Sequence, residues 1–147
     1  MKQVFVMLFS ALAIESAHTQ SISKTDSVCG IFGIACGYSA TPEESTMKMI
    51  RLVNQNDKAQ LLNWMNSNNP QNKIHGFVGL YFMKRNGYSL SKDEKGQVDA
   101  AKRSNPVIDY CSGCISGTRD NFSNLITSQN LRAYYTWYVK SGYNKLK

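Results

Sequence analysis

Residues 70–87 constrain the fold more than any other stretch, because they combine the start and end signals of one helix with an almost continuous apolar interior. Asn69 is a preferred N-cap residue, and Pro70 suits the first helical position, where its missing N–H group costs nothing. Gly87 can take the left-handed conformation that ends many helices. The apolar residues between these signals surround the helix: Ile74, Phe77, Val78, Leu80, Tyr81, Phe82 and Met83. A helix that is apolar on every side is a buried helix, so we expect the rest of the chain to pack around it.

Two glycines and a histidine interrupt this apolar helix. Gly76 and Gly79 each lower helix propensity by about 1 kcal/mol, so we expect a neighbouring element to approach closely on their side. His75 lies between apolar residues and allows either a metal or acid–base role or a buried structural role. The structural role is favoured, because no nucleophile motif accompanies this histidine.

Further helices are predicted on both sides of the central one. Thr41 with Glu44, and Ser91 with Glu94, are capping-box patterns that each precede a helical stretch. Asp57 is expected to start another helix between them. The helix after Ser91 is polar, so we expect it to lie on the outside of the domain.

The signals are weaker after Asn105. Residues 106–115 look like a shorter and less regular counterpart of the central helix, and residues 117–121 look like a polar connector. Phe122 starts a helical turn or two, and a final helix with apolar residues from Leu131 to Val139 is expected to end near Gly142. The tyrosines of that last stretch also allow a strand, but no partner strand is predicted elsewhere. The expected fold class is mainly α, a small antiparallel helical array with a cysteine-containing N-terminal loop.

The capped helices and short Asn/Ser/Pro turns of residues 41–114 resemble the helix pairs of HEAT-type repeat domains. The residues that carry the resemblance are Leu61 and Leu62 before Asn69 and Pro70, and Val98 before Asn105 and Pro106. The two sets are about 36 residues apart, which is within the range of helix-pair repeats. The resemblance implies stacked antiparallel helices and a scaffold or binding role rather than catalysis.

The beginning of the chain is expected to be a signal peptide. Lys2 precedes an apolar run at residues 4–13, and small residues follow that fit a cleavage site. We therefore assign residues 1–19 to the signal peptide, residues 20–40 to an N-terminal segment with a Cys29/Cys36 loop, and the remaining residues, 41–147, to a helical domain. Neither the apolar run nor the central helix is long enough to span a bilayer comfortably. A secreted or periplasmic protein without a transmembrane segment in its mature chain is the expectation.

The four cysteines are Cys29, Cys36, Cys111 and Cys114. An even number of cysteines in an exported chain predicts disulfides, and three pairings remain open. The CxxC spacing of Cys111 and Cys114 also fits an exchangeable redox disulfide, although a strand–helix–strand context is not evident. A zinc site would need an unusually long gap between Cys29 and Cys36. We expect structural disulfides and no metal or other cofactor.

The formal charge of +7 favours an anionic partner, but the basic residues form no run, so nucleic acid is not expected. A basic aromatic stretch near the C-terminus is either a core face or a binding surface that consists of Arg132, Tyr134, Tyr135, Trp137, Tyr138 and Lys140. Most carboxylates fall at predicted helix starts, where capping explains them, so no catalytic residue is assigned. The prediction is a non-enzymatic interaction module that binds another protein or an anionic envelope component. The alternative is a thiol–disulfide redox protein that acts through Cys111 and Cys114.

Overall fold

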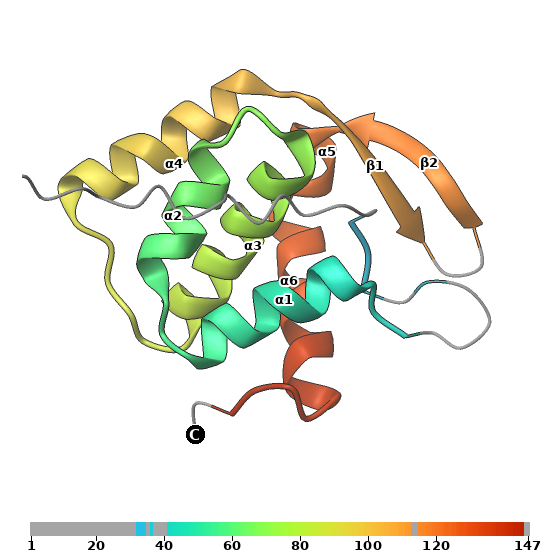
Figure 1. Cartoon of the computed structure of the whole chain (residues 1–147), viewed down its shortest axis with the longest axis horizontal. Helices are drawn as coiled ribbons and strands as arrows, with labels where there is room; N and C mark the ends of the chain where they lie inside the picture. The colour runs from blue at the N-terminus through green and yellow to red at the C-terminus, as the bar shows by residue number, and fades with distance from the viewer. Residues whose placement is uncertain (1–31, 35, 37–40, 113–114, 146–147) are drawn as a thin grey trace, which may run out of the picture.

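The computed structural model describes residues 32–34, 36, 41–112 and 115–145, and its elements surround one central helix (Figure 1). In chain order the elements are α1 (Glu44–Asn54), α2 (Lys58–Asn66), α3 (Pro70–Arg85), α4 (Lys92–Ser104), β1 (Val107–Ser112), β2 (Ile115–Asn121), α5 (Phe122–Leu125) and α6 (Ser128–Lys140). The mainly helical fold is therefore confirmed, with a small two-stranded sheet added to it. In the part of the chain that is described, no helix has the length and apolar character needed to cross a membrane. The predicted signal peptide and most of residues 20–40 lie outside this part.

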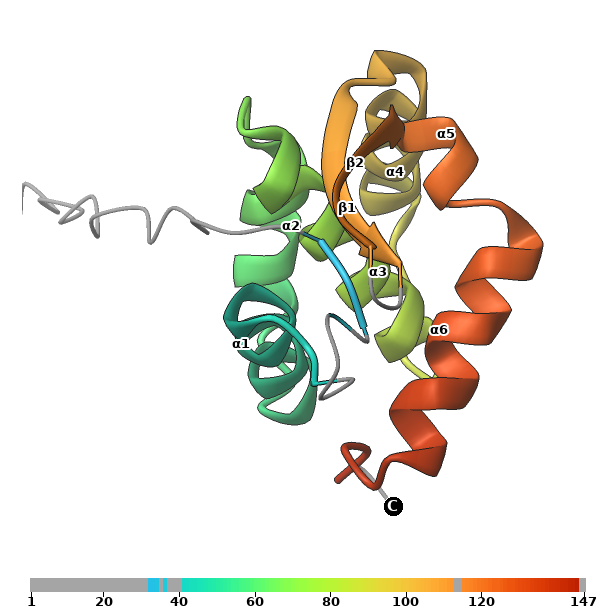
Figure 2. The same cartoon turned by 90° about the vertical axis from the view of Figure 1, so that its right-hand side faces the viewer.

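The central position of α3 follows from its apolar sequence and confirms the prediction. The Asn69 side chain accepts hydrogen bonds from the backbone N–H groups of Gln71 and Asn72 at 2.8 and 3.3 Å, and Pro70 occupies the start of the helix. Gly87 follows the helix with a φ of +98°, the left-handed conformation expected there. Figure 2 shows α1 and α2 on one side of α3 and α6 on the other. The side chains of α3 that are no more than 5% exposed are those of Asn72, Ile74, His75, Phe77, Val78, Leu80, Phe82 and Met83.

The two glycines of α3 allow the neighbouring helices to approach its backbone. A Cβ atom at Gly76 would lie 2.5 Å from the carbonyl oxygen of Leu61 and 2.9 Å from the Cα atom of Met65, both in α2. A Cβ atom at Gly79 would lie 2.5 Å from the Leu61 side chain and 3.1 Å from that of Met49 in α1. A side chain fits at neither position without a shift of α2. The predicted close approach is therefore confirmed.

The capping-box predictions have different outcomes at α4 and α1. At α4 the Ser91 N–H group donates to Glu94 Oε2 at 2.7 Å, and the Glu94 N–H group donates to Ser91 Oγ at 3.2 Å, as predicted. The box predicted at Thr41 is not formed, because α1 starts later, with Glu43 at its N-cap and no side-chain cap bond. The Thr41 carbonyl instead accepts a hydrogen bond from the Cys36 N–H group at 3.1 Å, in an antiparallel bridge that precedes the helix.

Residues 106–121 contain an antiparallel hairpin, so the prediction of a helical segment followed by a connector is wrong. Asn105 has a φ of +36° and ends α4 instead of starting another helix. β1 then pairs with β2, with Val107 opposite Asn121. The exposed fraction changes from 55% at Val107 to 0% at Ile108, so these adjacent side chains of β1 face opposite sides of the strand. β2 has one large apolar residue, Ile115, in an otherwise polar sequence, so no apolar–polar alternation marked it as a strand.

The N-terminal segment adds a strand-like contact to this hairpin. The Phe32 N–H group donates to the Asp109 carbonyl at 3.0 Å, and the Cys111 N–H group donates to the Phe32 carbonyl at 2.9 Å. Phe32 thereby forms a parallel bridge with Tyr110 of β1, and its ring is 1% exposed. The sequence predicted a cysteine-containing loop for this segment, and at Phe32 the structure has a strand-like arrangement.

Candidate functional site

A groove of about 740 Å³ lies between α3, α4 and the start of α6. Two helix faces form its walls: Phe77, Leu80, Tyr81 and Lys84 of α3, and Lys95, Val98, Asp99 and Lys102 of α4. In each helix the second, third and fourth of these residues follow the first by three, four and seven positions. This spacing places all four side chains on one face of the helix. The connection between the helices closes the groove with Tyr88 and Leu90, and Ile126 and Leu131 line it from the C-terminal part of the chain.

The floor of this groove is continuous with the core. Leu80 is 2% exposed and Leu131 is 8% exposed, and both belong to the buried apolar cluster around α3. The volume lies within the range of about 300–1,000 Å³ that is typical of small-molecule sites, which are also mainly apolar with a few polar groups. The groove therefore has the size and the lining of a ligand site.

The rim of the groove carries more positive than negative charge, with Lys84, Lys95 and Lys102 against the single carboxylate of Asp99. Lys102 Nζ lies 3.4 Å from Asp99 Oδ1 and 6.0 Å from the centre of the Phe77 ring, so this lysine has partners. Lys84 and Lys95 are exposed, and neither has an acidic partner within the described ranges. Two lysines of the rim are thus free to meet an anion.

Sequence reasoning did not find this groove. Its lining comes from separate segments, which only the fold brings together. The available signal was Val98, an apolar residue on an otherwise polar helix, with Lys95 three residues before it and Lys102 four residues after it. In the sequence, Val98 supported only the resemblance to a helix pair, and the polar helix as a whole was predicted to lie on the outside.

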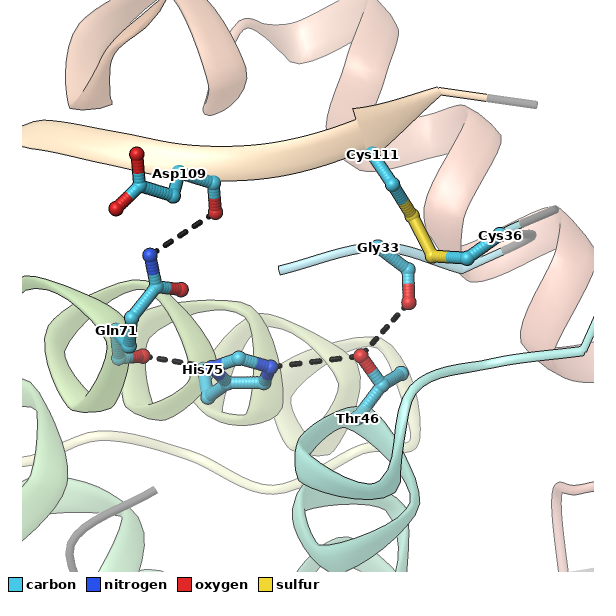
Figure 3. Close-up of a disulfide and its surroundings, with 7 residues drawn as sticks. All are labelled: Gly33, Cys36, Thr46, Gln71, His75, Asp109 and Cys111. Carbon is cyan, nitrogen blue, oxygen red and sulfur yellow. Dashed lines mark hydrogen bonds between the residues drawn. A yellow bond between two sulfur atoms is a disulfide. The ribbon is translucent and has the colours of Figure 1, made fainter. Parts of the chain in front are cut away.

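The disulfide between Cys36 and Cys111 joins the N-terminal segment to β1 (Figure 3). Among the pairings that the sequence left open, the structure has Cys36 with Cys111, whereas Cys29 and Cys114 lie outside the described residues. The two half-cystines are 9% and 7% exposed. A Cβ atom at Gly33 would lie 2.6 Å from Cys36 Sγ and would overlap Cys111 Sγ, so this backbone covers the bond closely. The cross-link is buried and spans 75 residues of the chain.

His75 lies in a chain of hydrogen bonds beside the same segment (Figure 3). Its Nδ1 atom is 2.6 Å from the Gln71 carbonyl oxygen, which can only accept, so Nδ1 carries the proton. The Thr46 hydroxyl donates to the Gly33 carbonyl at 2.8 Å, and Thr46 Oγ1 lies 3.4 Å from His75 Nε2. The Gln71 side chain in turn donates to the Asp109 carbonyl at 2.9 Å. Thr46 therefore connects α1 to the N-terminal segment, and Gln71 connects α3 to β1. The unprotonated Nε2 of His75 contacts Thr46 between these two connections, because the hydroxyl proton of Thr46 is donated to Gly33.

Burial decides the charge of this histidine. The pKa of His75 is lowered from 6.5 to about 4, because desolvation disfavours the imidazolium more than the Gln71 hydrogen bond favours it. The ring is 0% exposed, and the Phe32 ring packs edge-on against it at 5.2 Å. A neutral, buried and hydrogen-bonded ring is the structural role that the sequence favoured for His75.

The tyrosines of the predicted basic aromatic stretch contribute to the core. Tyr138 is 0% exposed, stacks on Phe82 with 4.7 Å between ring centres, and donates its hydroxyl to Asn54 Oδ1 at 2.8 Å. Tyr134 packs edge-on against Phe32 at 5.4 Å, and burial raises its pKa to about 12. These two rings fix α6 to α3 and to the N-terminal segment.

The other members of this stretch lie between core and surface. Tyr135 is partly buried and donates its hydroxyl to Asn86 Oδ1 at 2.8 Å. Trp137 is also partly buried and packs against Tyr143 at 5.3 Å, whereas Arg132 and Lys140 are exposed. None of the stretch lines the groove. Of the two alternatives for this stretch, a core face therefore describes the tyrosines, whereas the exposed residues are Arg132 and Lys140.

Neither a metal cluster in the described residues nor a known relative points to a function. Over residues 32–34, 36, 41–112 and 115–145, no three His, Cys, Asp or Glu side chains are placed to hold a metal ion together. A scan against protein-family models, a search of curated proteins and a search of solved structures find no match for this chain. The geometry of the groove is therefore the best guide to function.

Proposed function

We propose that this protein is an exported, non-enzymatic binding module whose ligand occupies the groove between α3 and α4. The observation that carries the proposal is an apolar floor, including Leu80 and Leu131, that continues from the core into an opening of about 740 Å³. Covering apolar surface is favourable by roughly 25 cal/mol per Å², so a ligand with an apolar part gains free energy there. The lysines of the rim suit a partner that also carries negative charge.

The helical frame supports a binding role. We propose that α2 and α3 are a HEAT-type helix pair, in which a short connection makes the helices antiparallel neighbours. The close contact at Gly76 and the buried face of α3 make this pair a firm support for the groove. Helix pairs of this kind commonly present surfaces to partners, which agrees with a module rather than an enzyme.

Export is supported by two independent features. Lys2 and the apolar run at residues 4–13 have the pattern of a signal peptide. The disulfide between Cys36 and Cys111 is of a kind that persists mainly in oxidising compartments. A secreted or periplasmic location would bring the basic protein close to anionic envelope components or to other exported proteins.

The rival proposal is thiol–disulfide exchange through Cys111 and Cys114. The low exposure of Cys111 and Cys36 argues for a structural bond, because exchange needs a thiolate that can reach a sulfur atom. The variant Cys114→Ser leaves the Cys36–Cys111 bond intact and separates the two proposals. A binding module keeps its ligand affinity in this variant, whereas a CxxC redox protein loses the ability to catalyse the reduction of insulin disulfides.

Titration with Nile red, an uncharged fluorescent apolar dye, tests the groove directly. We expect saturable binding with one site per chain and at least a tenfold weaker affinity in Val98→Trp, which narrows the groove. Ala100→Trp is the matched control, because Ala100 is exposed on the same helix and does not line the groove. Equal affinities in the two variants, with folding checked by circular dichroism, would refute the assignment of the groove.

A further inference from the structure

The two unpaired lysines lie at one end of the groove. Lys84 is in the last turn of α3 and Lys95 is near the start of α4, so both flank the short connection between these helices. Lys102 is seven residues further along α4, about 10 Å away at 1.5 Å per residue. Its ammonium group is already engaged by Asp99 and by the Phe77 ring. The groove therefore has one end with free positive charge and one end whose charge is compensated.

Apolar residues continue from this charged end along the groove. Val98 lies between the lysines of α4, and Leu80 forms the floor opposite it on α3. Ile126 and Leu131 line the groove from α6 and the residues before it. The groove thus combines an apolar lining with one end where two lysines can meet an anion.

We propose that the ligand of this groove is a free single-chain acyl carboxylate, with its tail on the apolar floor and its carboxylate between Lys84 and Lys95. The inference rests on the proposed function, because it names the ligand class of the same groove. Charge complementarity supports it, since an ammonium group stabilises a nearby carboxylate and the two lysines have no competing acidic partner in the described part of the chain.

The dimensions of the groove favour a small molecule over a peptide or a membrane surface. A helical peptide needs a long open groove for successive anchors, whereas Tyr88, Leu90 and Leu131 bound this one. A membrane contact needs protruding apolar side chains, and the large apolar side chain that is exposed in the described residues is Val107, which does not line the groove. The groove therefore lacks the protruding apolar side chain that insertion into a bilayer needs.

Three probes with a twelve-carbon chain and different head groups test the inference. Dodecanoate, dodecanol and dodecyltrimethylammonium are compared by their ability to displace Nile red from the full chain. We expect dodecanoate to bind about tenfold more tightly than dodecanol and the cation to bind most weakly. Added salt is expected to weaken dodecanoate selectively, because it screens exposed charges.

Charge variants test whether Lys84 and Lys95 cause the preference for dodecanoate over dodecanol. Lys84→Gln combined with Lys95→Gln is expected to reduce the preference for dodecanoate over dodecanol to less than about threefold. Lys140→Gln with Lys145→Gln is the matched control, because it makes the same change in net charge at exposed positions outside the groove. The control is expected to keep the tenfold preference. An equal loss in both variants would overturn the assignment of the carboxylate to Lys84 and Lys95.

The possible failures separate the inference from the proposed function. If Nile red binds in the groove but the three probes are equivalent, the carboxylate inference is overturned and the binding module remains. The same conclusion follows if the protein cosediments with phosphatidylglycerol vesicles and does not bind dodecanoate. If Nile red itself does not bind, the proposed function and the inference are both overturned.

Discussion

Acidification is expected to weaken the fold through His75. Burial lowers the pKa of His75 to about 4 in the folded protein, against an ordinary value of 6.5. Between these values the unfolded chain binds a proton that the folded protein does not bind, so the free energy of unfolding decreases as the pH falls, by about 1.4 kcal/mol per pH unit. The expected loss is about 2 kcal/mol between about pH 7.5 and pH 5, and about 3 kcal/mol at the end of the window near pH 4. Above about pH 7.5 both states hold a neutral His75, so this residue contributes almost no slope there.

Urea denaturation followed by circular dichroism, at several pH values above about pH 5, measures this slope. The range excludes most carboxylate titration, including that of Glu94, whose pKa is lowered mainly by its hydrogen bond with Lys58. His75→Gln removes the titrating group. Because this substitution also changes the absolute stability, the two proteins are compared by the change of their unfolding free energy with pH. We expect the variant to lose less than about 0.5 kcal/mol over the same range. Equal slopes in the two proteins would refute a neutral, buried His75.

Two further changes test the packing of α3 and the cross-link, with the free energy of unfolding as the readout. Gly76→Ala is expected to lower it by about 2–3 kcal/mol, because the added methyl group meets the α2 backbone. Gly96→Ala is expected to raise the free energy of unfolding by about 1 kcal/mol, because a Cβ atom at this helical position has open space. If both glycine variants changed the free energy of unfolding in the same direction, the close packing at Gly76 would be contradicted. Cys36→Ser with Cys111→Ser is expected to lower the free energy of unfolding by about 4.5 kcal/mol in the chain-entropy model for a separation of 75 residues. A loss below about 1 kcal/mol would show that this bond does not constrain the unfolded chain.

The central helix could be predicted from the sequence because its signals are local. Asn69 and Pro70 define its start, the apolar residues surround it, and Gly76 reports a close neighbour without naming it. The final helix was also predicted, since its apolar residues have helical spacing. In each case the pattern lies within one element, so local physics is enough.

The features that depend on distant residues could not be predicted in the same way. β1 is a strand because Phe32 and β2 supply its hydrogen-bond partners, and neither is evident from the residues around Val107. The partner of Cys111 depends on where Phe32 pairs with β1, because this contact places Cys36 beside it. The groove needs α3, α4 and α6 together. What the sequence lacked in each case was the tertiary contact.

Solution NMR of the full chain during titration with dodecanoate tests the central claim, that the groove between α3 and α4 is the binding site. Saturable shifts are expected at the backbone amides of residues that line the groove, such as Leu90, Val98 and Ile126, with little change at the exposed positions Arg132 and Thr136 of α6. Saturable shifts confined to the exposed positions of α6, or no saturable shifts at all, would contradict the claim.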